Sequence, residues 1–231
     1  MPSPFGPKKS NESRRNPRLY MKPLHKTTIQ FAEKGTLFRI ANISIGGLGF
    51  FSENNPIKPE DKKISIILNI NTNRFKVDIE VMHRGEDIIG CAYLDPSPSL
   101  VATIEDYFKT ELLALKMSMV ETRDEAESKW KTIYFRGQNN CELVIQEIEG
   151  ELQHFSIILF GNYIEGDANK TLCVGEKIGS ELIAAPAGVH FYKPVPVANR
   201  HLIESAIRFI DYVQGLSEKR KKSILESLSL S

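Results

Sequence analysis

Two arginines spaced R-x-x-x-R, Arg14 and Arg18, lie near the start of the chain with Arg15 between them. A guanidinium is always charged and planar, and it can bind a phosphate or a guanine edge through two parallel hydrogen bonds. Basic N-terminal segments are common, so the three side chains taken alone favour a solvated tail. They indicate an anion site only together with a second motif.

That second motif is N-x-S-x-x-G, formed by Asn42, Ser44 and Gly47 where one expected strand turns into the next. Asn and Ser can both hydrogen-bond nearby backbone, and Gly supplies a positive φ, so a plain turn would also account for the motif. The order and spacing of the two motifs together are more specific than either one.

R-x-x-x-R followed by [D/N]-x-S-x-x-G resembles the signature of PilZ domains, the bacterial receptors for cyclic di-GMP. The segment "ANISIGGLGF" is similar to the family's turn between its second and third strands. "VMHRGEDIIGCAYLD" (81–95) resembles its final hairpin, in which G-x-x-[FY] precedes the C-terminal helix. The resemblance covers residues 12–116 and implies a six-stranded antiparallel barrel with a helix capping one end.

The resemblance also implies roles for the arginines. Arg14 and Arg18 would contact the guanine acceptors O6 and N7 and the phosphates of cyclic di-GMP, from a loop that wraps around the ligand. Arg15 would add a phosphate contact or a stacking face. Ordering a flexible arm costs roughly 1–2 kcal/mol per residue, so we expect an arm with two states, one of which the ligand selects.

On the barrel, the resemblance implies that Asn42 and Ser44 hydrogen-bond a guanine base and its surroundings. Gly47 would keep the turn open so that the base can lie against the backbone. Many family members have Asp where this sequence has Asn42, which removes one carboxylate acceptor.

The elements that must position these residues are six short strands joined by turns rich in Gly, Asn, Asp and Pro. Connections this short join antiparallel neighbours and leave no room for crossover helices. A small closed barrel removes the sheet edges. The expected strands are 25–32, 35–44, 48–53, 62–70, 75–84 and 88–95.

A long amphipathic helix is expected over 96–130, with Ser99 as its N-cap. The charged stretch 121–129 is interpreted as a linker or as the solvated end of this helix. The expected organisation is a disordered basic arm (1–11), a PilZ domain (12–120), this linker, and a C-terminal domain (130–231) of unknown role.

The second half is predicted to be an α+β unit with an antiparallel sheet, with a degenerate second barrel as the alternative. The fold class of the whole chain is therefore mainly β with α. The glycine-spaced segments 161–167 and 173–179 are interpreted as hairpin turns, and we expect no second ligand site. The expected strands are 131–137, 140–150, 152–162, 170–175 and 179–185, followed by one or two helices over 199–231.

Composition excludes several function classes. No nucleophile elbow, HExxH, P-loop or GxGxxG appears, so we expect no enzyme, catalytic residue or cofactor. Cys91, Cys141 and Cys173 form no CxxC pair. They are expected to be buried free thiols and not a zinc site or a redox dithiol.

No apolar run approaches the roughly 20 residues of a membrane span, and the start lacks a signal-peptide core, so we expect a cytoplasmic protein without membrane insertion.

Two alternatives to a cyclic di-GMP receptor remain. The first is nucleic-acid binding through the basic arm and the "EKRKK" cluster (218–222), against which the net charge of +1 and the lack of an aromatic stripe argue. That cluster is interpreted as a solvated helix face near a helix end, where it complements the dipole. The second is a ligand-free PilZ fold that serves as an interaction module, against which the intact motifs argue. Family analogy implies a protein partner in motility, secretion or surface-polysaccharide machinery.

Overall fold

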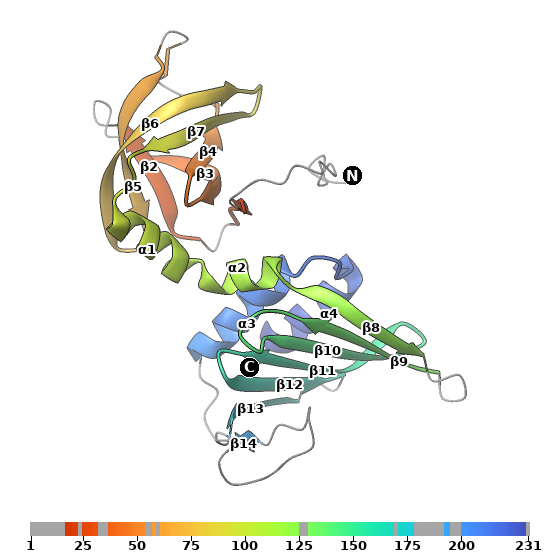
Figure 1. The fold of residues 1–231 in the computed structure, drawn as a ribbon. Coiled ribbons are helices and arrows are strands. Elements are labelled where there is room, and N and C mark those ends of the chain that lie inside the picture. Colours follow the sequence, from red (N-terminus) through yellow and green to blue (C-terminus); the bar gives the residue numbers. More distant parts are fainter. Residues whose placement is uncertain are drawn as a thin grey trace. The chain divides into compact units, whose positions relative to one another are not determined.

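The computed structural model describes residues 17–22, 25–31, 37–53, 57–58, 61–124, 129–168, 171–177, 192–194 and 200–229. The chain divides into two compact units, Met1–Tyr107 and Phe108–Ser231 (Figure 1). The expected basic arm (1–11) and the expected strand 179–185 lie outside the described residues.

The first unit is a closed antiparallel barrel of six strands, as the sequence predicts. The strands run in the order β3-β2-β5-β6-β7-β4, and β4 pairs again with β3 to close the ring. A seventh strand, β1 (Leu19–Tyr20), is added to β3 and was not expected. The ring strands are β2 (Thr27–Phe31), β3 (Leu37–Ser44), β4 (Gly47–Phe51), β5 (Lys63–Ile70), β6 (Asn73–Arg84) and β7 (Ile88–Leu94).

Alternation of side chains along the strands fills the barrel interior. On β5 every second residue, Ile66, Leu68 and Ile70, is fully buried. Phe31 of β2 and Phe50 of β4 meet edge to face, with ring centroids 5.7 Å apart. The interior is therefore a packed apolar core that fixes which residues face outward.

A helix follows the barrel but begins and ends differently from the prediction. Helix α1 (Pro98–Tyr107) is capped by Ser97, whose Oγ accepts a hydrogen bond from the backbone N–H of Leu100 at 3.2 Å, so Ser99 is not the N-cap. Pro98 suits the first helical position because its missing N–H would have no partner there. The buried side chains Leu100 and Ile104 lie on α1, which packs against β5.

The expected continuation of this helix to residue 130 is wrong. A second helix, α2 (Lys109–Leu115), follows α1, and Ser118–Asp124 then form strand β8, which pairs antiparallel with β9 (Trp130–Arg136). The charged composition of 121–129 suggested a linker or a helix end, but backbone pairing with β9 extends through Asp124. The division of the chain into two units falls between Tyr107 and Phe108, so α2 and β8 belong to the second unit.

The second unit contains an antiparallel sheet of seven strands in sequential order from β8 to β14. Among the described residues β8 and β14 do not pair, so the sheet is open and the alternative of a degenerate barrel is not supported. Its remaining strands are β10 (Glu142–Ile148), β11 (Glu151–Leu159), β12 (Asn162–Asp167), β13 (Leu172–Lys177) and β14 (Tyr192–Pro194).

Two of these strands are formed by segments that were predicted to be hairpin turns, 161–167 and 173–179. Residues Asn162–Asp167 form β12, and Cys173–Lys177 lie within β13. The turn before β12 consists of Phe160 (φ 53°) and Gly161 (φ 77°). Positive φ at both central residues is the type I′ geometry that matches the twist of paired strands. The first glycine of 161–167 therefore belongs to a turn, whereas the residues after it belong to a strand.

Helices α3 (Arg200–Tyr212) and α4 (Glu218–Ser229) lie on one face of this sheet, and α2 packs against α3 (Figure 1). Two bidentate ion pairs connect these elements, one between two helices and one between a helix and the sheet. Arg208 of α3 donates from Nε and Nη2 to the fully buried Glu111 of α2, the second bond measuring 2.8 Å. Arg220 of α4 donates to Glu147 of β10, which is 2% exposed, at 2.7 and 2.9 Å.

The cysteines differ from one another in burial. Cys91 and Cys141 are buried, as expected, and loss of solvent raises the pKa of each thiol to about 11. Cys173 is exposed, so the expectation of three buried thiols is wrong at this position. The described part of the chain has no group of His, Cys, Asp and Glu side chains arranged to hold a metal ion. Among the described helices, none combines the length and the apolar character that crossing a membrane requires.

We predict that Arg208→Met destabilises the second unit by about 3–5 kcal/mol, because it leaves the Glu111 carboxylate buried without a cation. Chemical denaturation followed by the fluorescence of Trp130, the single tryptophan of the chain, measures the unfolding of this unit. The double variant Glu111→Leu/Arg208→Met should recover most of the loss.

The control is Arg200→Ala, which removes an exposed i,i+4 partner of Glu204 on the same helix. It should change stability by less than about 0.5 kcal/mol. An equal loss in Arg208→Met and Arg200→Ala would show that the Glu111 pair has no special role.

Candidate ligand-binding site

Strand β1 brings the first motif to the second. Leu19 lies opposite Ile43 and Tyr20 opposite Asn42, in antiparallel register. The backbone N–H of Met21 continues the pairing by donating to the carbonyl of Ala41 at 2.9 Å. Arg18 directly precedes Leu19, the first residue of β1. The last arginine of R-x-x-x-R therefore directly precedes the strand that pairs with the N-x-S-x-x-G segment.

Burial shows which side of this pairing faces outward. Leu19 and Ile43 are 1% and 0% exposed, so this pair points into the barrel core. Directly opposed residues share one face of a sheet, and the next pair along faces the other way. Tyr20 and Asn42 therefore project from the outer surface, where the Arg18 side chain is also exposed. The site is on the outside of the barrel, at the β1–β3 pair.

Asn42 is an outward-facing residue that is nevertheless 5% exposed. Its Oδ1 atom is buried and has no hydrogen-bond partner among the described residues. A buried acceptor without a partner costs about 1–3 kcal/mol. The amide side chain therefore offers an acceptor that a bound molecule could satisfy.

Gly49 makes room for this amide. It lies opposite Asn42 in the β3–β4 pairing, and a Cβ at this position would lie 2.8 Å from Asn42 Nδ2 and 3.1 Å from Oδ1. Any larger residue would displace the amide from its place over β4. Gly49 is not among the predicted site residues, although its spacing of two residues from Gly47 puts both on one face of the strand.

Ser44 and Gly47 are the opposed residues on either side of the two-residue turn between β3 and β4. Ser44 is 8% exposed, and its Oγ donates to the carbonyl of Gly47 at 3.2 Å. The backbone N–H of Tyr93 on β7 donates to the carbonyl of Gly46 at 3.1 Å and fixes this turn to the barrel. In this arrangement the serine hydroxyl is used within the turn, and its oxygen can still accept a hydrogen bond.

Gly47 is required for a reason other than the expected positive φ. Its φ does not lie in the left-handed region. Instead, a Cβ on Gly47 would lie 2.2 Å from the carbonyl oxygen of Cys91 and 3.0 Å from Cα of Ala92. The glycine allows β4 to approach the backbone of β7 closely, and so helps to close the barrel beside the site.

The β3–β4 pairing brings together Asn42, Ser44 and Gly47, and Arg18 directly precedes the strand that pairs with β3. Arg14 and Arg15 lie outside the described residues. A further residue at the site, Tyr20, was also missed. Its only sequence signal is its position two residues after Arg18, which in a strand puts both side chains on one face.

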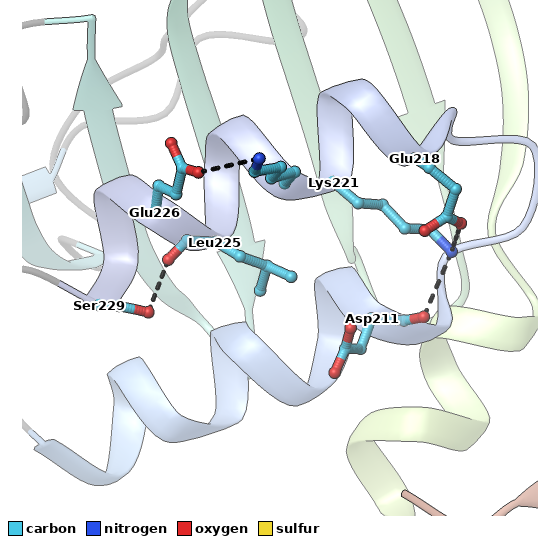
Figure 2. A pocket seen from close by; sticks show the side chains of 7 residues that line it. Asp211, Glu218, Lys221, Leu225, Glu226 and Ser229 are labelled. Carbon is cyan, nitrogen blue, oxygen red and sulfur yellow. Dashed lines mark hydrogen bonds and ion pairs between the residues drawn. The ribbon is translucent and has the colours of Figure 1, made fainter. Parts of the chain in front are cut away.

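A different cavity, of about 480 Å³, lies between α3 and α4 of the second unit (Figure 2). Its charged groups bind one another. Lys221 donates to the carbonyl of Asp211 at 3.3 Å and lies 3.6 Å from Glu218, as Figure 2 shows. Within it, no described acceptor resembles the unpartnered amide of Asn42.

The basic cluster at 218–222 has acidic partners. Each of its four cations lies within ion-pair distance of a carboxylate; the partners of Lys219, Arg220, Lys221 and Lys222 are Glu151, Glu147, Glu218 and Glu226. The cluster also occupies the first turn of α4, where a helix favours anions, so the expected match to the dipole is wrong. These pairs leave little positive charge to attract nucleic acid.

Comparison with protein-family models gives a match that covers most of the first unit. Residues 12–109 match the family model described as "PilZ domain", which confirms the resemblance seen in the sequence. The crystal structure of an uncharacterized Legionella protein is similar over 40% of this chain and 89% of its own, with 15% identity and a TM-score of 0.32. Among curated proteins, none matches this chain.

We predict a graded response to alanine at three glycines around the site. Gly47→Ala should be the most destabilising, by about 3 kcal/mol or more, because its Cβ would meet backbone that cannot move alone. Gly49→Ala should cost about 1 kcal/mol, because the end of the Asn42 side chain can swing away. Gly90→Ala should be nearly neutral, since its nearest neighbour would be Cβ of His83 at 3.7 Å.

Calorimetric unfolding of the full chain measures this series, with Gly90→Ala as the matched control. Equal losses at Gly47 and Gly90 would contradict the assigned contact with Cys91.

Proposed function

We propose that the PilZ domain at residues 12–109 makes this protein a receptor for cyclic di-GMP, which binds on the outer barrel surface at the β1–β3 pair. The PilZ family is a family of non-catalytic cyclic di-GMP receptors, and the site residues of this chain carry its motifs. Arg14, Arg15, Arg18, Asn42, Ser44 and Gly47 would form the binding site.

The observation that carries the proposal is the pairing of Tyr20 with Asn42. The exposed Arg18, two residues before Tyr20, would then lie near Asn42, whose buried amide oxygen has no partner among the described residues. One group donates and carries positive charge, while the other accepts. An anionic ligand that also has N–H donors would satisfy both.

Guanine nucleotides have this combination of groups. The guanine base presents O6 and N7 as acceptors on one edge, which suits the paired donors of an arginine. It also carries N–H donors, which suit Asn42 Oδ1. The two phosphates of cyclic di-GMP supply the anionic partners of the remaining arginines.

Because Asn42 is 5% exposed, a base can reach Oδ1 only when the groups over the amide move. We therefore include a local rearrangement of the outer surface in the proposal. The ligand would select the rearranged state and order the arginine arm, offsetting the arm's conformational entropy with charge-assisted hydrogen bonds.

The output of this switch would be read by the unit Phe108–Ser231 or by a protein partner. Family analogy suggests a partner in motility, secretion or polysaccharide machinery. The internally paired cations at 218–222 support a protein-directed role for the second unit over a nucleic-acid-directed one.

We predict that Arg18→Ala weakens cyclic di-GMP binding by about tenfold to a hundredfold, because a hydrogen bond to a charged group is worth about 1.5–3 kcal/mol. Isothermal titration calorimetry of the full chain at physiological salt measures the affinity and stoichiometry. The control is Arg74→Ala, which removes an exposed arginine on β6 and should leave the affinity unchanged.

Unchanged affinity in Arg18→Ala would refute the site assignment. A wild-type chain that binds a single-stranded oligonucleotide but not cyclic di-GMP would refute the proposed function and favour the nucleic-acid alternative. A chain that binds neither would favour the interaction module.

We predict that cyclic di-GMP slows trypsin cleavage after Arg14 and Arg15, because the ligand would order the arm and cover both guanidinium groups. Mass spectrometry of timed digests measures this rate, and cleavage after Arg136 on β9 serves as the internal reference. Equal rates with and without ligand, at saturating binding, would contradict ordering of the arm.

A further inference from the structure

Tyr20 is one of the most exposed large apolar side chains of the first unit, at 64%. Its strand, β1, contains only Leu19 and Tyr20, and Leu19 is 1% exposed. The burial of Leu19 therefore orients the neighbouring phenol ring outward. This exposure is a consequence of the anchor and not of a loose chain end.

The ring stands at one end of a row of directly paired residues on the outer face. The row crosses five strands and consists of Tyr20, Asn42, Gly49, Gly90 and His83. The two glycines in its middle carry no side chain. Asn42 has two direct neighbours in this row, Tyr20 and Gly49, and of these only Tyr20 carries an aromatic ring.

Cross-strand neighbours on one face have Cβ atoms about 4.5–5.5 Å apart. A planar base that bonds Asn42 Oδ1 through its edge would therefore lie within reach of the Tyr20 ring. Arg18 lies two residues before Tyr20, a spacing that in an extended chain puts both side chains on one side. The guanidinium can therefore approach the base from the side of the Tyr20 ring.

We propose that Tyr20 is a base-stacking residue of this site, which holds the guanine whose edge Asn42 binds. This inference rests on the proposed function, since it names the group that contacts the face of the same base. Stacking contributes affinity that depends little on the identity of the base, because every base has a π face. Asn42 would then read the edge, while Tyr20 supplies the surface.

The test is calorimetric titration of the full chain with cyclic di-GMP, in four variants. Tyr20→Ala and Tyr20→Leu should each weaken binding about tenfold, which is within the range for loss of one stacked base. Tyr20→Phe keeps the ring and should bind within about twofold of wild type, as the lost hydroxyl is not required for stacking. Leu37→Ala removes a 60% exposed apolar side chain from the far end of β3 and should have no effect.

Calorimetric unfolding without ligand separates binding from folding. Because Tyr20 is largely exposed, all four variants should unfold within about 0.5 kcal/mol of wild type. Full affinity in Tyr20→Leu would overturn the proposal, because an aliphatic side chain cannot stack. Loss in Tyr20→Phe as large as in Tyr20→Ala would also overturn it, since the hydroxyl would then be the binding group.

Failure of this inference is distinguishable from failure of the proposed function. If wild type binds cyclic di-GMP and Arg18→Ala binds it weakly, normal binding by Tyr20→Ala rejects the stacking residue alone. If wild type does not bind cyclic di-GMP, the proposed function fails first, and the stacking proposal falls with it.

Discussion

The pairing of β1 with β3 is the constraint on which the candidate site depends. On the inner face of this pairing, Leu19 packs into the core opposite Ile43. Burying a leucine side chain stabilises the fold by about 1.5–3 kcal/mol. On the outer face of the same two strands, Tyr20 adjoins Asn42. One short strand therefore joins an arm rich in arginine to the barrel and fixes the register between the two motifs.

The second unit is held together by a different kind of contact. Two buried carboxylates each bind an arginine through two hydrogen bonds: Glu111 joins α2 to α3, and Glu147 joins the sheet to α4. Such pairs favour one helix position over others because a bidentate bond tolerates little displacement. The same pairing removes Arg220 from the exposed basic cluster. These two carboxylates therefore serve packing, whereas Arg18 of the first unit is exposed near the candidate site.

Much of the first unit could be predicted from sequence, since alternation and Gly or Asn turns are local signals. The barrel strands follow from these signals, as does the position of Asn42, Ser44 and Gly47 where one strand turns into the next. The role of Gly47 could not be predicted, because its requirement arises from the Cys91 carbonyl on a strand far along the chain. Strand β8 was mistaken for helix for the same reason: its partner β9, and not its own composition, determines its conformation.

Because Leu19 is buried in the barrel core, it limits how far the preceding arginines can move from the barrel surface. Arg14 is four residues from Arg18, so an extended chain keeps it within roughly 14 Å of that residue. If cyclic di-GMP contacts the barrel surface as proposed, the remaining arginines would meet it at a high effective concentration instead of by separate collisions. The arm would then act as a chelating tether, in which each weak contact raises the probability of the next.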